Sequence, residues 1–132
     1  MSEPVLLKLL ILDDEVRILS ALRRTLRREP YEIFTAETIA EARRVLESEA
    51  IDLVLSDHKM PGTTGLVFLE EAARRRPHAV RMLITGWTET IPESSVAALG
   101  IRAVIAKPWE DAALKETLRL AAKQARDDRA RP

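Results

Sequence analysis

The stretch VLSDHKMPGTTG, Val54–Gly65, is an apolar run that stops at an acidic residue and then breaks at Pro61 and Gly62. A buried strand that ends in a carboxylate places charged oxygens at the rim of a sheet, where a metal ion or a substrate can reach them. Parallel α/β sheets hold their functional groups at this rim. The stretch therefore predicts a parallel sheet with Asp57 at its carboxyl edge.

Four more apolar runs have the character of buried strands. A continuous apolar run is typical of a strand that is covered on both faces. With the stretch above, these runs predict strands at LKLLIL (7–12), YEIFTA (31–36), IDLVLSD (51–57), AVRMLIT (79–85) and IRAVIA (101–106).

Helical patterns separate these runs. Apolar side chains recur at helical spacing within 15–29, 37–49, about 66–76, 91–99 and from about 109 onward. The spacing predicts these inward-facing residues: Val16, Leu19, Leu22 and Leu26; Ala42, Val45 and Leu46; Leu66, Leu69 and Ala73; Leu114, Leu118, Ala121 and Ala125. Five strands, each followed by a helix, predict one doubly wound α/β domain with a parallel sheet. We expect this domain to cover 1–122, and KQARDDRARP (123–132) to be a frayed, charged tail or the start of a linker.

The composition excludes several classes of function. With 132 residues, 46% hydrophobic and 32% charged, the chain has the size and character of one soluble globular domain. Its formal net charge of 0 provides no general attraction to nucleic acid or to an anionic membrane. The absence of Cys excludes disulfides and thiolate chemistry. The apolar N-terminal run is too short to span a bilayer and has no basic leader, so we expect a cytoplasmic protein.

Five polar residues fall at the predicted carboxyl ends of four strands: Asp13, Asp14, Asp57, Thr85 and Lys107. Three close carboxylates repel one another, and burial raises their pKa values unless a cation compensates. Mg²⁺ prefers such oxygen ligands and leaves room for water and phosphate. A lysine and a hydroxyl can bind phosphoryl oxygens, so the set is suited to making and holding an aspartyl phosphate.

Each of these residues also has a structural interpretation. Acids such as Asp13 and Asp14 are common at the start of a helix, where they favour the helix dipole. An Asp before a Pro-Gly turn is commonly a turn former. The functional interpretation is favoured because all five residues fall at strand ends in one sequential pattern.

The ordered motifs LDDE, SDHKMPG, LITGW and AKPW resemble those of receiver domains of response regulators in two-component signalling, over roughly residues 6–122. The resemblance implies the flavodoxin-like receiver fold with strand order 2-1-3-4-5. It also implies a cis peptide bond between Lys107 and Pro108.

The resemblance further implies a role for each site residue. Asp57 would be the phosphoacceptor, and Asp13 and Asp14 would hold Mg²⁺ together with Asp57 and the backbone carbonyl of Lys59. Thr85 would be the switch hydroxyl, and Lys107 would pair with the phosphoryl group.

The same resemblance implies partners for the domain. A histidine kinase or a phosphotransfer protein would phosphorylate it, and it would then switch an output domain or a downstream protein. It would be no enzyme beyond its own phosphorylation and dephosphorylation. A homodimer could form through the fourth helix, fifth strand and fifth helix.

Two departures from the family pattern involve three positions. Val104 stands where many receivers carry an aromatic residue that rotates on activation. Lys59 and Trp87 occupy the variable positions that line the route of attacking water, and both are bulky. We interpret His58 and His78 as surface or loop residues, and Trp109 as a packing residue at a helix start.

Three other functions fit these residues less well. A phosphorylation-independent adaptor of the same fold is the main alternative, and binding of a partner to an Asp57→Ala variant would distinguish the two. A haloacid-dehalogenase-like phosphatase would have an Asp two residues after its nucleophile, where this chain has Lys59. Direct DNA binding is disfavoured because no helix-turn-helix pattern is present.

Overall fold

The fold is built on one five-stranded parallel sheet. The structure is a computed structural model that describes residues 6–86 and 91–130. The strand order is β2-β1-β3-β6-β7, and every neighbouring pair is parallel. The strands are β1 (Leu7–Leu12), β2 (Tyr31–Ala36), β3 (Leu53–Asp57), β6 (Val80–Gly86) and β7 (Ile101–Lys107). Counted within the sheet alone, this order is the predicted 2-1-3-4-5.

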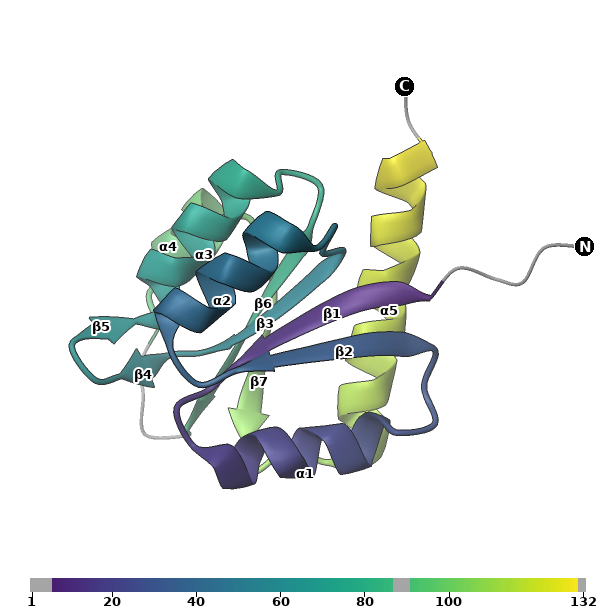
Figure 1. Ribbon diagram of the computed structural model, residues 1–132, viewed down its shortest axis with the longest axis horizontal. Helices are drawn as coiled ribbons and strands as arrows, with labels where there is room; N and C mark the ends of the chain where they lie inside the picture. Colours follow the sequence, from purple (N-terminus) through teal and green to yellow (C-terminus); the bar gives the residue numbers. More distant parts are fainter. Residues whose placement is uncertain (1–5, 87–90, 131–132) are drawn as a thin grey trace, which may run out of the picture.

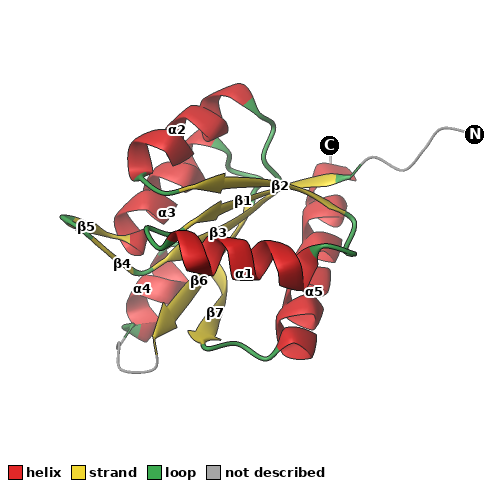
Figure 2. Ribbon diagram, turned by 60° about the horizontal axis from the view of Figure 1, so that its bottom comes forward, coloured by secondary structure: helices red, strands yellow, loops and turns green. Residues whose placement is uncertain are grey.

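Helices cover both faces of the sheet (Figure 1). Helices α1 (Val16–Leu26) and α5 (Asp111–Ala130) lie on one face. Figure 2 shows the other three helices together on the opposite face: α2 (Ile39–Ser48), α3 (Gly65–Arg75) and α4 (Glu93–Ala98). None of the described helices combines the length and the apolar character needed to cross a bilayer.

The alternation of side chains along β1 explains why its sequence is continuously apolar. Leu9 and Ile11 pack into the core on the α1 and α5 side, whereas Leu10 and Leu12 pack into the core on the α2 and α3 side. All four have no exposed surface. A strand between two helix layers buries both sets of its side chains, so no polar alternation remains in its sequence.

A small hairpin follows β3 where the sequence predicted a loop. Strands β4 (Lys59–Met60) and β5 (Thr63–Thr64) pair in antiparallel fashion. Pro61 and Gly62 form the turn between them, and the φ of +78° at Gly62 lies in the left-handed region that glycine adopts without strain. The hairpin separates the end of β3 from the start of α3.

Several inward-facing positions were predicted correctly, and others were not. The buried positions on α5 include all four of the predicted residues, Leu114, Leu118, Ala121 and Ala125. The prediction for Val16 was wrong, because this first residue of α1 is 55% exposed. On α3 the fully buried apolar side chains are Phe68, Leu69 and Ala72 rather than Ala73.

The expectation of a frayed segment after residue 122 was also wrong. Helix α5 continues to Ala130. Ala125 is buried, and Arg129 Nη1 lies 2.8 Å from Asp52 Oδ1 in an ion pair. Apolar packing and this ion pair hold the charged end of the helix against the sheet.

Candidate functional site

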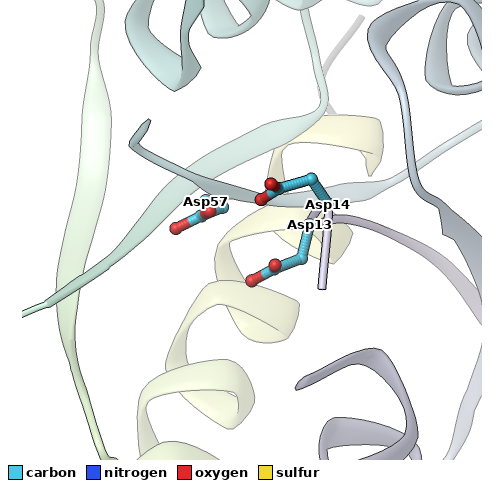
Figure 3. Close-up of side chains that lie close together, drawn as sticks. All are labelled: Asp13, Asp14 and Asp57. Atoms are coloured by element: carbon cyan, nitrogen blue, oxygen red, sulfur yellow. The ribbon is translucent and has the colours of Figure 1, made fainter. Parts of the chain in front are cut away.

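Three carboxylates meet at the carboxyl edge of the sheet. Asp13 and Asp14 follow β1, and Asp57 ends the neighbouring strand β3. One oxygen from each of the three lies within 4.8 Å of the other two, and the side chains point into the same space (Figure 3). Asp13 and Asp57 are 0% and 4% exposed, whereas Asp14 is open to solvent. The acidic site that the sequence predicted is therefore present.

The end of β1 is fixed by bonds on both sides of Asp13. Its backbone N–H donates to the carbonyl of Ala36 in β2 at 3.1 Å. Its Oδ1 accepts a hydrogen bond of 2.8 Å from the backbone N–H of Glu15, at the start of α1. Asp13 thus supports the start of the helix as well as lining the site, and the two interpretations of this acid are compatible.

Asp57 is held by the chain that follows it. The backbone N–H of Gly65 donates to the carbonyl of His58 at 2.6 Å, which brings the start of α3 against the end of β3. A Cβ atom at Gly65 would clash with the backbone carbonyl oxygen of Asp57. Glycine at this position therefore allows the close approach of α3 to the end of β3.

Lys107 links two of the carboxylates. It ends β7, and its Nζ lies 2.8 Å from Asp13 Oδ2 and 2.9 Å from Asp57 Oδ1. The Lys107–Pro108 peptide bond is cis, as predicted. Trp109 Nε1 donates to Thr25 Oγ1 at 3.2 Å, which attaches the turn after β7 to α1. Trp109 also packs against the core, in agreement with the interpretation of its sequence position.

The electrostatics of the site favour an added cation. Burial raises the pKa of Asp57 to about 6, and the negative charge of Asp13 adds to this, although Lys107 and the N–H of His58 act in the opposite direction. Burial alone would lower the pKa of Lys107, but its hydrogen bonds to Asp13 and Asp57 outweigh that effect and raise it. One lysine therefore does not fully compensate the carboxylates.

The donor set fits Mg²⁺. This ion binds oxygen at about 2.0–2.1 Å in octahedral geometry, so ligand oxygens around one ion are about 3–4 Å apart. The carboxylate oxygens of Asp13, Asp14 and Asp57 fall within 4.8 Å of one another. Lys59 lies next to this site on β4 with its side chain exposed. The predicted use of its backbone carbonyl as a ligand stays a prediction.

Thr85 lies on the neighbouring strand, and its hydroxyl bonds to the backbone rather than to a carboxylate. It is 5% exposed near the end of β6, and its hydroxyl donates to the carbonyl of Gly86 at 2.8 Å. Val104, on β7, is 45% exposed. Trp87, which the sequence places on the water route, lies outside the described residues.

One histidine was misjudged from the sequence. His78 is exposed, as expected, but His58 is buried directly after Asp57. No local pattern in the sequence indicates this burial.

The fold and the site together define a class of protein. This chain is a doubly wound α/β domain with an acidic cation site and a lysine at the topological switch point of its sheet. The sequence profile of the response regulator receiver domain matches residues 9–119. The chain belongs to the receiver domain family of two-component response regulators.

Curated relatives agree with this assignment. The hydrogenase transcriptional regulatory protein HoxA of Cupriavidus necator is 40% identical over 115 residues, which are 85% of this chain and 23% of that protein. The transcriptional regulatory protein GlrR of Escherichia coli is 33% identical over 111 residues, which are 83% of this chain and 25% of that protein. The chain thus spans about a quarter of the length of these relatives.

Solved structures share the fold over nearly the whole chain. A CheY-like receiver domain protein from Methanospirillum hungatei has a TM-score of 0.84 at 30% identity, covering 93% of this chain and 99% of that one. The receiver domain of an HD domain-containing protein from Pseudomonas fluorescens has a TM-score of 0.87 at 27% identity, also with 93% and 99% coverage.

Proposed function

We propose that Asp57 accepts a phosphoryl group in a reaction that requires Mg²⁺. The supporting observation is a buried carboxylate whose pKa is raised to about 6, beside two further carboxylates and one lysine amine. Above this pH the carboxylate is ionised and can act as a nucleophile. Its Oδ1 accepts hydrogen bonds from Lys107 and His58, whereas Oδ2 accepts none from the described residues.

The proposed reaction transfers the phosphoryl group to Asp57 Oδ2. The new P–O bond forms as the bond between phosphorus and the donor's leaving group breaks. Lys107 Nζ, now shared between two carboxylates, would move to a phosphoryl oxygen and form a charge-assisted hydrogen bond with it. When bound, Mg²⁺ would neutralise negative charge on the carboxylates and the phosphoryl oxygens. Thr85 would turn its hydroxyl from Gly86 toward the same group.

The partners follow from the family. A histidine kinase or a phosphotransfer protein would donate the phosphoryl group, and an output domain or a downstream protein would respond. We propose that the domain catalyses no reaction beyond its own phosphorylation and dephosphorylation. A cytoplasmic location and the division into a domain at 1–122 and a following segment stay predictions.

The face proposed for a homodimer has exposed apolar residues. Val104 of β7 and Leu120 of α5 are 45% and 49% exposed. Strand β7 is also at the edge of the sheet, beside α4. Association through α4, β7 and α5 would cover these residues. Beryllofluoride is a mimic of the phosphoryl group, and a larger sedimentation coefficient in its presence would support a dimer that forms on phosphorylation.

Intact-mass measurement tests the acceptor. The protein incubated with acetyl phosphate and Mg²⁺ should gain one phosphoryl group, and EDTA should prevent this. Asp57→Asn should gain none, because the nucleophile is gone. Asp13→Ala should gain much less, because it removes one expected metal ligand.

Glu70→Gln is the matched control, since Glu70 is an exposed acid on α3, away from the site. It should gain the phosphoryl group at the wild-type rate. An unchanged gain in Asp57→Asn would exclude Asp57 as the acceptor.

A further inference from the structure

The end of α1 and the turn that follows it carry a dense group of arginines. The group consists of Arg23, Arg24, Arg27 and Arg28, and we call it the α1 arginine cluster. All four residues are exposed. Because the formal net charge of the whole chain is 0, this concentration of positive charge is a local feature of one flank of the domain.

The α1 arginine cluster is not neutralised by acids of the described part of the chain. There, Arg23 is the one member whose side chain forms a hydrogen bond, and it donates to two uncharged oxygens of β2 at 3.3 Å. The side chains of the other three form neither a hydrogen bond nor an ion pair with a described residue. Glu29, the next acid along the chain, lies 3.1 Å from Arg119 and is therefore already paired.

A similar run of arginines at the end of α3 is neutralised. Arg74 lies 2.9 Å from Glu70, and Arg75 lies 2.8 Å from Glu71. Both runs are at the C-terminal end of a helix, where the helix dipole favours cations. Since both runs benefit from the dipole, the dipole does not explain why the α1 arginine cluster has no acidic partners.

The spacing of the α1 arginine cluster makes this lack of anions unfavourable. Arg23 and Arg27 are four residues apart, and so are Arg24 and Arg28. Like charges at this spacing on a helix repel each other. A bound anion would remove this repulsion.

Three members of the cluster line a hollow between α1 and the edge strand β2. The hollow has a volume of about 370 Å³, and its lining residues are Arg23, Arg24, Arg27, Tyr31 and Ile33. Helix α1 lies beside β2, and Tyr31 is the first residue of that strand (Figure 1). Because Asp57 ends its strand at the opposite edge of the sheet, the hollow is separate from the acidic site.

The charge density of the hollow indicates the class of ligand. A guanidinium group can donate two parallel hydrogen bonds to phosphate or carboxylate oxygens. A di- or triphosphate group brings several negative charges into one small volume, whereas an acidic peptide has single carboxylates spaced along a backbone. We propose that the hollow binds a di- or triphosphate group, carried by a nucleotide or present as free polyphosphate. This binding goes beyond phosphorylation of Asp57 and does not depend on it.

Amide chemical shifts test the proposal. The ¹⁵N-labelled protein is titrated with ATP, tripolyphosphate and adenosine in EDTA-containing buffer, which keeps Mg²⁺ from the acidic site. ATP and tripolyphosphate should shift the amide signals of residues 23–33 and leave those of Asp57 and Lys107 unchanged. Adenosine should shift none of them, because it has no phosphate. Equal affinities for ATP and tripolyphosphate would locate recognition in the phosphates, and a higher affinity for ATP would add a contact to the nucleoside.

Substitutions distinguish a site from a general basic surface. Arg24→Gln and Arg27→Gln each remove one lining guanidinium and should weaken ATP binding about five-fold. Arg28→Gln removes the same charge from the same cluster but outside the lining, and it should weaken binding by less than about two-fold. Arg74→Gln changes the net charge equally at the end of α3 and should leave the affinity unchanged.

Four results would overturn the proposal. The absence of shifts with ATP and tripolyphosphate at millimolar concentration would exclude the site. Shifts confined to Asp57 and Lys107 would place the anion at the acidic site instead. Equal weakening by Arg27→Gln and Arg28→Gln would reduce the binding to general charge attraction. Tighter binding of a glutamate-rich peptide than of tripolyphosphate would assign the hollow to an acidic protein.

Discussion

Two groups of acids in this domain have opposite electrostatic character. At the carboxyl edge of the sheet, burial raises the pKa of Asp57 to about 6. Between α2 and α3, a hydrogen bond from Arg43 lowers the pKa of Glu71 to about 2, with Arg75 contributing in the same direction. Both carboxylates are poorly exposed, at 4% for Asp57 and 15% for the Glu71 side chain.

The number of nearby cations explains the difference. Glu71 Oε2 lies 2.6 Å from Arg43 Nε and 2.8 Å from Arg75 Nε, so two cations pair with one partly buried acid. At the sheet edge, three carboxylates lie together, and one lysine pairs with only two of them, Asp13 and Asp57. Matched charges stabilise the packing of two helices, whereas unmatched charges leave a site that gains stability when a cation binds.

Of the substitutions in these two groups, removal of Lys107 should change the free energy of unfolding most. Lys107→Met leaves Asp13 and Asp57 buried without their cation, and we expect a loss of roughly 4 kcal/mol in the free energy of unfolding at pH 7 without Mg²⁺. Urea unfolding measures the loss. Added Mg²⁺ should recover more stability in the variant than in the wild type, because the ion replaces the lost charge.

Lys123→Met is the control for this experiment, since Lys123 is exposed on α5. It should change the free energy of unfolding by less than about 0.5 kcal/mol. If Lys107→Met lowered the free energy of unfolding by an equally small amount, the three carboxylates at the sheet edge would not need this lysine for stability.

The raised pKa of Asp57 should make the stability of the domain depend on pH. Its native pKa of about 6 lies above the ordinary value of 3.8, so between these pH values the native state holds a proton that the unfolded state has released. Stability must then fall as pH rises through this window. A shift of about two pKa units corresponds to roughly 3 kcal/mol.

Asp57→Asn isolates this contribution. In EDTA-containing buffer, the variant should gain stability relative to the wild type as pH rises from 4 to 7, by roughly 3 kcal/mol in total. Urea midpoints at four pH values measure the gain. A constant difference across this range would mean that the pKa of Asp57 is not raised.

Substitution of Glu71 should change stability least, and its contribution to stability should depend on pH in the opposite direction to that of Asp57. Its native pKa lies below the ordinary value of 4.5, so its contribution is complete above that pH and is lost as pH falls toward 2. Because Arg43 and Arg75 are 42% and 38% exposed, solvent screens the pairs, and Glu71→Gln should cost only about 1 kcal/mol at pH 7.

The cost of Glu71→Gln should shrink as the buffer is brought from pH 6 to pH 3. It should also decrease in high salt, whereas the effect of Lys107→Met at the more buried rim should respond less. If the stability lost in Glu71→Gln grew as the pH fell, the pKa of Glu71 would not be lowered in the native state.

The sheet and the acidic rim could be predicted because both depend on local patterns. Each strand is a continuous apolar run, and parallel topology brings the residues after successive strands to the same edge. This reasoning placed Asp13, Asp14, Asp57 and Lys107 together without any distance information. Thr85 was placed on the correct strand, but no sequence pattern indicates that its hydroxyl donates to the Gly86 carbonyl.

The features that were missed depend on contacts between distant parts of the chain. The strands of the β4–β5 hairpin have two residues each, too few for a periodic pattern. The charged end of α5 looks like a tail until Arg129 is seen to pair with Asp52, 77 residues earlier. The burial of His58 likewise has no local signal in the sequence.

Helix α5 has a mechanical consequence for the domain. At about 1.5 Å per residue, its 20 residues extend about 30 Å along the sheet. Near its first turn, Asp111 accepts a hydrogen bond of 3.1 Å from Thr25, and near its last turn Arg129 binds Asp52 at 2.8 Å. The helix is therefore attached to the rest of the domain by polar contacts near both of its ends. Asp52 directly precedes the strand that ends at Asp57, so the ion pair joins the last turn of α5 to the start of that strand.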